Sequence, residues 1–268
     1  MLDKLLSDSR LYRDSKDYKE LLEFVIRLRN FAPFNAMLLQ VQKPGLSYAA
    51  PASDWFERFD RWPKVGARPL LILRPFGPVA LVYDVLDTEG RDLPQDVETF
   101  FARGPIDETR MDSLFIRMER KSFVLHFIDA GDHAAGSIRV TKRASDEKTS
   151  NKYAININAN HLPPTQFATL VHELGHLFLG HLGSDYALKV PARNVPELSQ
   201  RELEAESVSF IVCARNGVKS KSESYLANFV TEHTTVDNID IYQIMRAAGQ
   251  VEAFLGLGTQ SHHSVLRR

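Results

Sequence analysis

Apolar residues recur at helical spacing in several stretches of the first half of the chain. A proline that suits a helix start and Ser53 as an N-cap mark where such helices begin. Helices are therefore expected over 16–30 and 34–42 and from Ser53 onwards, with a shorter helix over 95–103. Two apolar runs rich in β-branched residues are expected to form strands over 70–73 and 79–85.

The second half combines strands with two longer helices. Strands are expected over 122–128, 137–140 and 153–158, and the charged stretch 141–152 is expected to be an exposed loop. Pro163 and Pro164 can open a helix, because the N–H groups of a first helical turn have no intrahelical partner. An apolar stripe carries this helix to Phe178, and a second buried helix is expected over 201–213.

These elements predict an α+β fold in two parts. Gly104 and Pro105 form the best candidate boundary. We therefore expect a mixed α/β N-terminal region over 1–105, a second domain over 106–258 and a flexible tail over 259–268.

Composition and charge are those of an ordinary globular protein. The 268 residues are 44% hydrophobic and 25% charged, and the net charge of −1 gives no bulk attraction to nucleic acid or membrane. The single cysteine, Cys213, lies in an apolar run and is expected to be buried. Without a signal-peptide pattern, a membrane-length apolar run or a disulfide, the chain is expected to be cytosolic.

Four aromatic residues follow Ser53 at helical spacing. They are Trp55, Phe56, Phe59 and Trp62. Large rings at this spacing are typical of a helix face that packs on a core. We favour core packing for them over stacking on nucleic-acid bases.

The predicted helix that ends at Phe178 contains Val-His-Glu-Leu-Gly-His. His172 and His176 are four residues apart and project from one face, where their imidazoles can bind one Zn²⁺. Glu173 lies about 100° round the helix from His172, a position that in this motif reaches water held by the metal. The motif predicts a zinc site in which Glu173 is the general base and the ion polarises the carbonyl under attack.

The context of the motif supports this interpretation. Three fixed positions in five arise by chance in roughly one in a hundred chains of this size. Here the motif lies on a predicted helix, after a strand that could bind an extended substrate, and the small Gly175 precedes the second histidine. The competing interpretation is a pair of surface histidines on an amphipathic helix.

A third ligand is expected in the second helix, which begins Arg-Glu-Leu-Glu-Ala-Glu. Glu202 and Glu206 share one face, so one can bind the metal while the other accepts the free ring N–H of a metal-bound histidine. Glu204 is rotated about 160–200° from both, and we expect Glu204→Ala to leave zinc binding nearly intact. The competing interpretation is an exposed acidic helix start that favours the helix dipole.

Two further features concern the surroundings of the metal. The metzincin arrangement would need glycine and histidine where Leu179 and Leu182 stand, so that pattern is absent. For the group that stabilises the oxyanion, the candidates are Tyr225, Arg201 and His181.

The motifs resemble the ImmA/IrrE family of metallopeptidases. The resemblance rests on the strand Tyr-Ala-Ile-Asn-Ile-Asn, on His-Glu-Leu-Gly-His followed by Leu-Phe-Leu-Gly-His, and on Arg-Glu-Leu-Glu-Ala-Glu. It implies a zincin-like domain with His172, His176 and Glu202 as the zinc ligands. Glu206 stands where the family more often has Asn or Asp, a departure that ArdC-type antirestriction proteins share.

The first half is similar to the N-terminal region of ArdC-type antirestriction proteins. The similarity covers 34–44, a following tryptophan and 66–75. In ArdC-like proteins this region is associated with single-stranded DNA binding, which the resemblance therefore implies for this chain. The two resemblances together span most of the sequence.

We expect a zinc-dependent metallopeptidase that cuts a cytosolic protein, and the family resemblance suggests a DNA-binding regulator as the substrate. The alternative is a single-stranded-DNA-binding or antirestriction-type protein whose zinc site is structural or minor. An interaction protein with a vestigial site is a third interpretation. The intact Glu173 disfavours the third, because a structural zinc site needs no general base.

Overall fold

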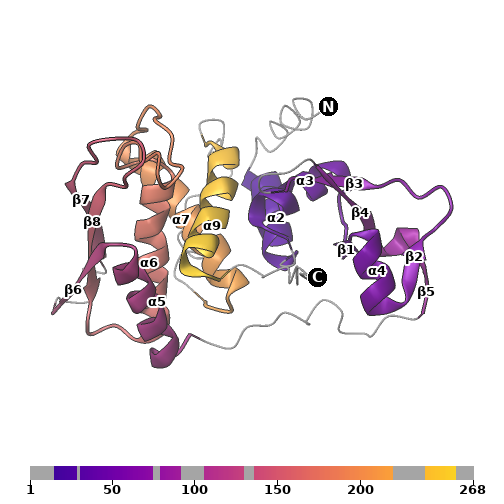
Figure 1. The fold of residues 1–268 in the computed structure, drawn as a ribbon, viewed down its shortest axis with the longest axis horizontal. Helices are drawn as coiled ribbons and strands as arrows, with labels where there is room; N and C mark the ends of the chain where they lie inside the picture. Colours follow the sequence, from indigo (N-terminus) through magenta and orange to yellow (C-terminus); the bar gives the residue numbers. More distant parts are fainter. Residues whose placement is uncertain are drawn as a thin grey trace. The chain divides into compact units, whose positions relative to one another are not determined.

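The computed structural model describes residues 15–28, 31–74, 79–91, 106–129, 136–219 and 239–257. The chain divides into two compact units on either side of residue 102, and both combine helices with small sheets (Figure 1). The organisation is α+β, as predicted. No described helix is long and apolar enough to cross a membrane. The predicted helix over 95–103, the boundary at Gly104 and the tail over 259–268 lie outside the described residues.

The first unit contains the predicted helices and strands together with short strands that have no clear sequence signal. Its helices are α2 (Ser15–Arg27), α3 (Pro33–Gln42) and α4 (Ala52–Phe59), with a 3₁₀ turn, η2, at Val85–Asp87. One antiparallel sheet has the order β1 (Ala49–Ala50), β4 (Ala80–Asp84), β3 (Leu70–Ile72). A second pairs β2 (Arg61–Pro63) with β5 (Thr88–Gly90).

Two side-chain amides of α3 cover the outer edge of β3. Asn35 exchanges two hydrogen bonds of 2.9 Å with the backbone of Leu73, and Gln42 exchanges two of 2.8 Å with the backbone of Leu71. An uncovered strand edge can pair with other chains. The amides therefore satisfy this edge and fix α3 against the sheet.

Trp55 forms the aromatic centre of the first unit, in agreement with the core-packing prediction. Its side chain is fully buried, and its indole Nε1 donates to the carbonyl of Tyr83 at 3.0 Å. The ring meets that of Tyr48 edge-on, with centroids 5.4 Å apart. Burial and a satisfied N–H together make Trp55 a structural residue.

The core-packing prediction is wrong for two of its neighbours. Phe56 and Trp62 are 63% and 47% exposed. Trp62 is exposed because α4 ends before Asp60, which adopts the left-handed conformation, so that Trp62 lies on a strand and out of helical phase. Phe56 lies on α4 but about 100° round the helix from the buried Trp55, and so on another face. Ser53 is also not the N-cap, because Pro51 takes that position.

The second unit places helices on one face of a three-stranded sheet (Figure 1). Its helices are α5 (Glu108–Arg120), α6 (Pro163–Phe178), α7 (Leu198–Arg215) and α9 (Ile241–Leu255). The strands follow the order β6 (Phe123–Ile128), β8 (Lys152–Asn158), β7 (Gly136–Lys142), with β8 parallel to β6 and antiparallel to β7. The three strands, α6 and α7 lie where they were predicted, although β7 and α7 are longer; α5 and α9 were not predicted.

Gly175 allows α6 and α7 to pack closely. A Cβ atom added to Gly175 would lie 3.3 Å from the carbonyl oxygen of Ala205 and 3.4 Å from Cβ of Val208. A larger side chain would have to push the two helices apart. The close approach brings the carboxylates of α7 next to the histidines of α6.

The opposite end of α7 is held by a buried ion pair. Arg215 Nε donates to Glu252 of α9 at 2.7 Å, and both side chains are almost completely buried. Cys213, two residues earlier, is fully buried as predicted, and burial raises the pKa of its thiol to about 12.

Candidate metal centre

His172 and His176 face one another from successive turns of α6. Their Nε2 atoms are 3.1 Å apart, and both side chains are mostly buried. The spacing of four residues on one helix produces this arrangement, because such residues lie one above the other on the same face.

Glu202 of α7 completes a group of three donor atoms. Its carboxylate oxygens lie 3.5 Å from Nε2 of His172 and 3.6 Å from Nε2 of His176. A tetrahedral zinc ion with bonds of about 2.0–2.2 Å separates its ligand atoms by about 3.3 Å. The two Nε2 atoms, 3.1 Å apart, are close to this value, and Oε2 of Glu202 lies 3.5 Å from His172 while its Oε1 lies 3.6 Å from His176, so the three side chains can hold such an ion.

Glu206 lies behind His172. Its Oε2 atom is 2.8 Å from Nδ1 of the imidazole, the ring nitrogen that points away from Glu202. An ionised carboxylate can only accept, so the Nδ1–H of His172 donates this bond. The contact fixes the ring and directs Nε2 towards the other donor atoms.

The two imidazoles have opposite electrostatic surroundings. Burial alone would lower the pKa of His172, but hydrogen bonds with Glu202 and Glu206 outweigh it and raise that pKa to about 10. Burial and then the charge of His172 lower the pKa of His176 to about 4. The hydrogen bond with His172 lowers the pKa of Glu202. At neutral pH His172 is therefore protonated and His176 is neutral, and a metal ion would have to displace one proton from His172.

Glu173 is buried beside the donor atoms and has no contact that would make it a fourth ligand. Burial raises the pKa of its carboxyl, while a backbone hydrogen bond from Ile138 of β7 opposes this shift. A raised pKa makes a carboxylate a stronger base near neutral pH. The same bond places Glu173 against β7.

Glu204 lies on the other side of α7 from Glu202 and Glu206, as its helical phase predicts. Its carboxylate is nevertheless fully buried and contacts His181, which in turn contacts His176. The sequence pattern does not predict this connection, because it depends on the loop after α6, which brings His181 back between His176 of α6 and Glu204 of α7. The expectation that Glu204→Ala leaves zinc binding nearly intact depends on helical phase alone and takes no account of this contact.

The structure distinguishes the three candidates for stabilising the oxyanion. His181 is unsuited to this role, because its side chain is buried and both ring nitrogens already have partners. Tyr225 lies outside the described residues. Arg201 remains, since its positive charge lowers the pKa of both His176 and Glu202 and its guanidinium therefore lies near the donor atoms.

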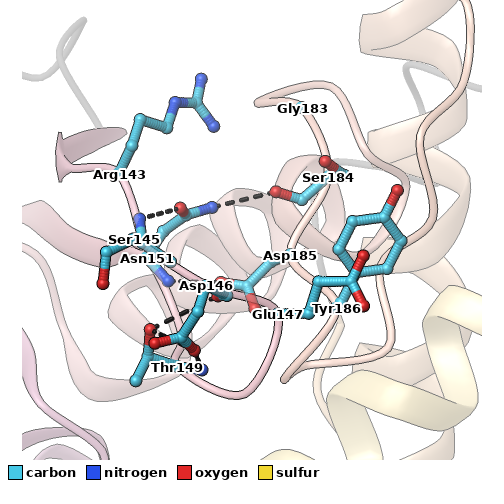
Figure 2. A pocket seen from close by; sticks show the side chains of 11 residues that line it. Arg143, Ser145, Asp146, Glu147, Thr149, Asn151, Gly183, Ser184, Asp185 and Tyr186 are labelled. Carbon is cyan, nitrogen blue, oxygen red and sulfur yellow. Dashed lines mark hydrogen bonds between the residues drawn. The ribbon is translucent and has the colours of Figure 1, made fainter.

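A separate cavity of about 440 Å³ lies between the loop after β7 and the loop after α6 (Figure 2). It includes none of the predicted site residues. Asp185 at its wall accepts hydrogen bonds of 2.8 Å from Ser150, the Asn151 backbone and the Tyr153 hydroxyl. These bonds join the two loops, so the polar groups here serve the structure.

Comparisons with known proteins agree with the motifs of the second unit. Residues 118–214 match the family described as the IrrE N-terminal-like domain, Peptidase_M78, a segment that contains the three strands, α6 and nearly all of α7. No curated protein matches the chain.

Two solved structures of the antirestriction protein ArdC from plasmid R388 are similar to this chain at 15% identity. The metal-free structure has a TM-score of 0.37 and covers 83% of this chain and 81% of its own. The Mn(II)-bound structure has a TM-score of 0.40, with 83% and 80% covered. The match over residues 118–214 confirms the resemblance to the ImmA/IrrE metallopeptidases for this part of the chain.

Proposed function

We propose that the chain is a zinc-dependent metallopeptidase with a zincin-like catalytic domain in its second unit. The observation that carries the proposal is the set of donor atoms from His172, His176 and Glu202, close enough together to hold one ion, with the buried Glu173 beside them. Imidazole and carboxylate ligands suit zinc. The described residues provide three protein ligands, which leaves a coordination position open, as in catalytic and not structural zinc sites.

Each residue of the centre has a distinct part in the proposed reaction. Bound zinc would supply Lewis-acid polarisation of the substrate carbonyl and an activated water. Glu173 takes a proton from the attacking water and later returns it to the leaving amine. Arg201, whose charge acts on both His176 and Glu202, offers its guanidinium to the oxygen that becomes negative, the kind of donor whose removal typically costs about 10²–10³ in turnover.

The strand β7 supports a peptide as the substrate. It is the last strand of the described sheet, with β8 on one side only. The N–H of Ile138 that donates to Glu173 belongs to the edge that β8 leaves free, because in an antiparallel pair a residue directs its backbone groups to one side. An extended peptide can add to such an edge through backbone hydrogen bonds and so pass Glu173.

We propose a cytosolic protein as the substrate, and a DNA-binding regulator as its class. The class rests on the resemblance to the ImmA/IrrE family and not on a feature of the site. The geometry of the site requires only that the substrate has an extended segment that can lie along β7.

The test is to add the zinc-loaded protein to a cytosolic extract and to identify new protein N-termini by mass spectrometry. Glu173→Gln is the matched control, because it keeps the side-chain size and the metal ligands but removes the base. We expect a small set of N-termini with the wild type that is absent with the variant and absent after chelation. Identical sets of N-termini from the two zinc-loaded proteins would contradict the proposal.

A second candidate function is single-stranded DNA binding by the first unit. The observation that favours it is the exposure of Phe56 and Trp62, since exposed rings can stack on bases. Titration with a labelled oligonucleotide at two salt concentrations tests it. Salt-dependent binding that Trp62→Ala weakens would support this function, and an unchanged affinity in the variant would exclude stacking on that ring.

A further inference from the structure

A chain of buried side chains leads from His176 to the far side of α7. Nδ1 of His176 lies 2.9 Å from Nδ1 of His181, and Nε2 of His181 lies 3.0 Å from Oε2 of Glu204. The side chains of His181 and Glu204 are 1% and 0% exposed. Neither residue touches the donor atoms directly.

Arg193 completes the chain. Its guanidinium donates to both oxygens of Glu204, at 3.0 and 3.1 Å, and to the carbonyl of Leu179 at 3.2 Å. A buried carboxylate needs a charged partner, and a bidentate ion pair with arginine fixes its position and keeps it ionised. Glu204 is thus fixed as a hydrogen-bond acceptor.

The positions of the protons follow from these contacts. Because Glu204 can only accept, the proton of a neutral His181 lies on Nε2, and its Nδ1 carries the lone pair. That lone pair requires a proton on Nδ1 of His176. The Nε2 atom of His176 is then the unprotonated nitrogen, and it is the atom that faces His172 and Glu202.

We propose that Glu204, acting through His181, is a positioning residue that holds His176 in the tautomer with a free lone pair on Nε2. The inference rests on the proposed metal site, for which this tautomer is the one that can bind. Each of the two histidines is then oriented by a different glutamate. Glu206 orients His172 by a direct hydrogen bond, and Glu204 orients His176 through the imidazole of His181.

The inference changes the expectation for Glu204. A residue without contact to the metal would leave zinc affinity nearly unchanged, as helical phase alone suggests. Loss of a residue that sets the tautomer of a metal ligand should weaken zinc affinity by about 10–100-fold, the typical effect of removing a side chain that hydrogen-bonds to a metal ligand.

The test uses the metal-free protein first. Proton–nitrogen NMR of the imidazole rings distinguishes the two tautomers of His176 at a pH where the ring is neutral. We expect the Nδ1–H tautomer in the wild type, and a mixture in Glu204→Gln and in His181→Phe. His181→Phe keeps the pair of Glu204 with Arg193, so it decides the question if Glu204→Gln does not fold.

Zinc affinity, measured by competition with a chromophoric chelator, is the second readout. Glu252→Gln is the matched control, because it also breaks a buried glutamate–arginine pair of α7 but lies away from the histidines. We expect affinity to fall about 10–100-fold in the folded Glu204→Gln and His181→Phe proteins and to stay unchanged in Glu252→Gln.

Two results would overturn the inference: an Nε2–H tautomer of His176 in the wild type, or unchanged tautomer and affinity in the folded variants. A wild type that binds no zinc would instead refute the proposed function, while the NMR result would still decide the role of Glu204.

Discussion

Nδ1 of His172 lies 2.8 Å from a carboxylate oxygen of Glu206, while Nε2 of the same ring faces Glu202 at 3.5 Å. One imidazole is thus held on opposite sides by two glutamates that are a single helical turn apart. Close packing at Gly175 brings both carboxylates within reach of α6. The two glutamates have different tasks, and substitution can separate them.

Glu202→Ala should weaken zinc binding more than Glu206→Ala. The first change removes a donor atom, and the second removes only the group that orients His172, which typically costs about 10–100-fold in affinity. Competition titration with a chelator gives both values. The opposite order of affinities would show that Glu206 is the ligand.

Replacing Gly175 should damage the centre without altering any ligand. Ala should have a small effect and Val a larger one, because a side chain here meets the backbone of Ala205 and pushes α7 away from α6. Overpacking of this kind costs about 1–3 kcal/mol in the free energy of unfolding. Urea unfolding and zinc competition are the measurements, and wild-type zinc affinity in Gly175→Val would contradict the packing argument.

Zinc binding should release about one proton and strengthen with rising pH. The pKa of His172 in the metal-free protein is raised to about 10, so its ring is protonated at neutral pH and must lose a proton to bind. Apparent affinity should therefore rise about tenfold per pH unit from neutral pH towards pH 10. Calorimetry in buffers of different ionisation enthalpy counts the protons. A pH-independent affinity would show that His172 is already neutral.

Cys213 should be inert to thiol reagents in the folded protein. Its side chain is fully buried, and burial raises its pKa to about 12, so almost no thiolate exists at pH 8. Above the ordinary thiol pKa of about 8.5, the unfolded chain ionises first and the burial disfavours folding. Reaction with Ellman's reagent should follow unfolding in urea. Rapid stoichiometric labelling of the native protein would contradict the burial.

The sequence predicts α6 within its observed limits because several signals agree there. Two prolines open the helix, and an apolar stripe continues to Phe178. The unpredicted α9 has comparable signals, since Asp240 caps its start and Gly256 adopts the left-handed conformation at its end. The two-residue strand β1, by contrast, is too short for any periodicity to mark it.

The predicted centre came from positions within single helices, which helical phase describes well. His172 and His176 share a face of α6, and Glu202 and Glu206 share the face of α7 that contacts His172. Helical phase says nothing about contacts made by a loop. His181 reaches Glu204 because the chain turns back after α6, at Gly180 with its positive φ of 80°. The contact between His181 and Glu204 therefore cannot be predicted from the sequence pattern.

The most direct test of the central claim is the zinc content of purified variants by elemental analysis. About one zinc per chain is expected in the wild type and in Glu173→Gln, because Glu173 is the base and not a ligand. Essentially none is expected in the double variant His172→Ala with His176→Ala. Undiminished zinc in the folded double variant, or loss of zinc from folded Glu173→Gln, would contradict the assignment of ligands and base on which the proposed peptidase rests.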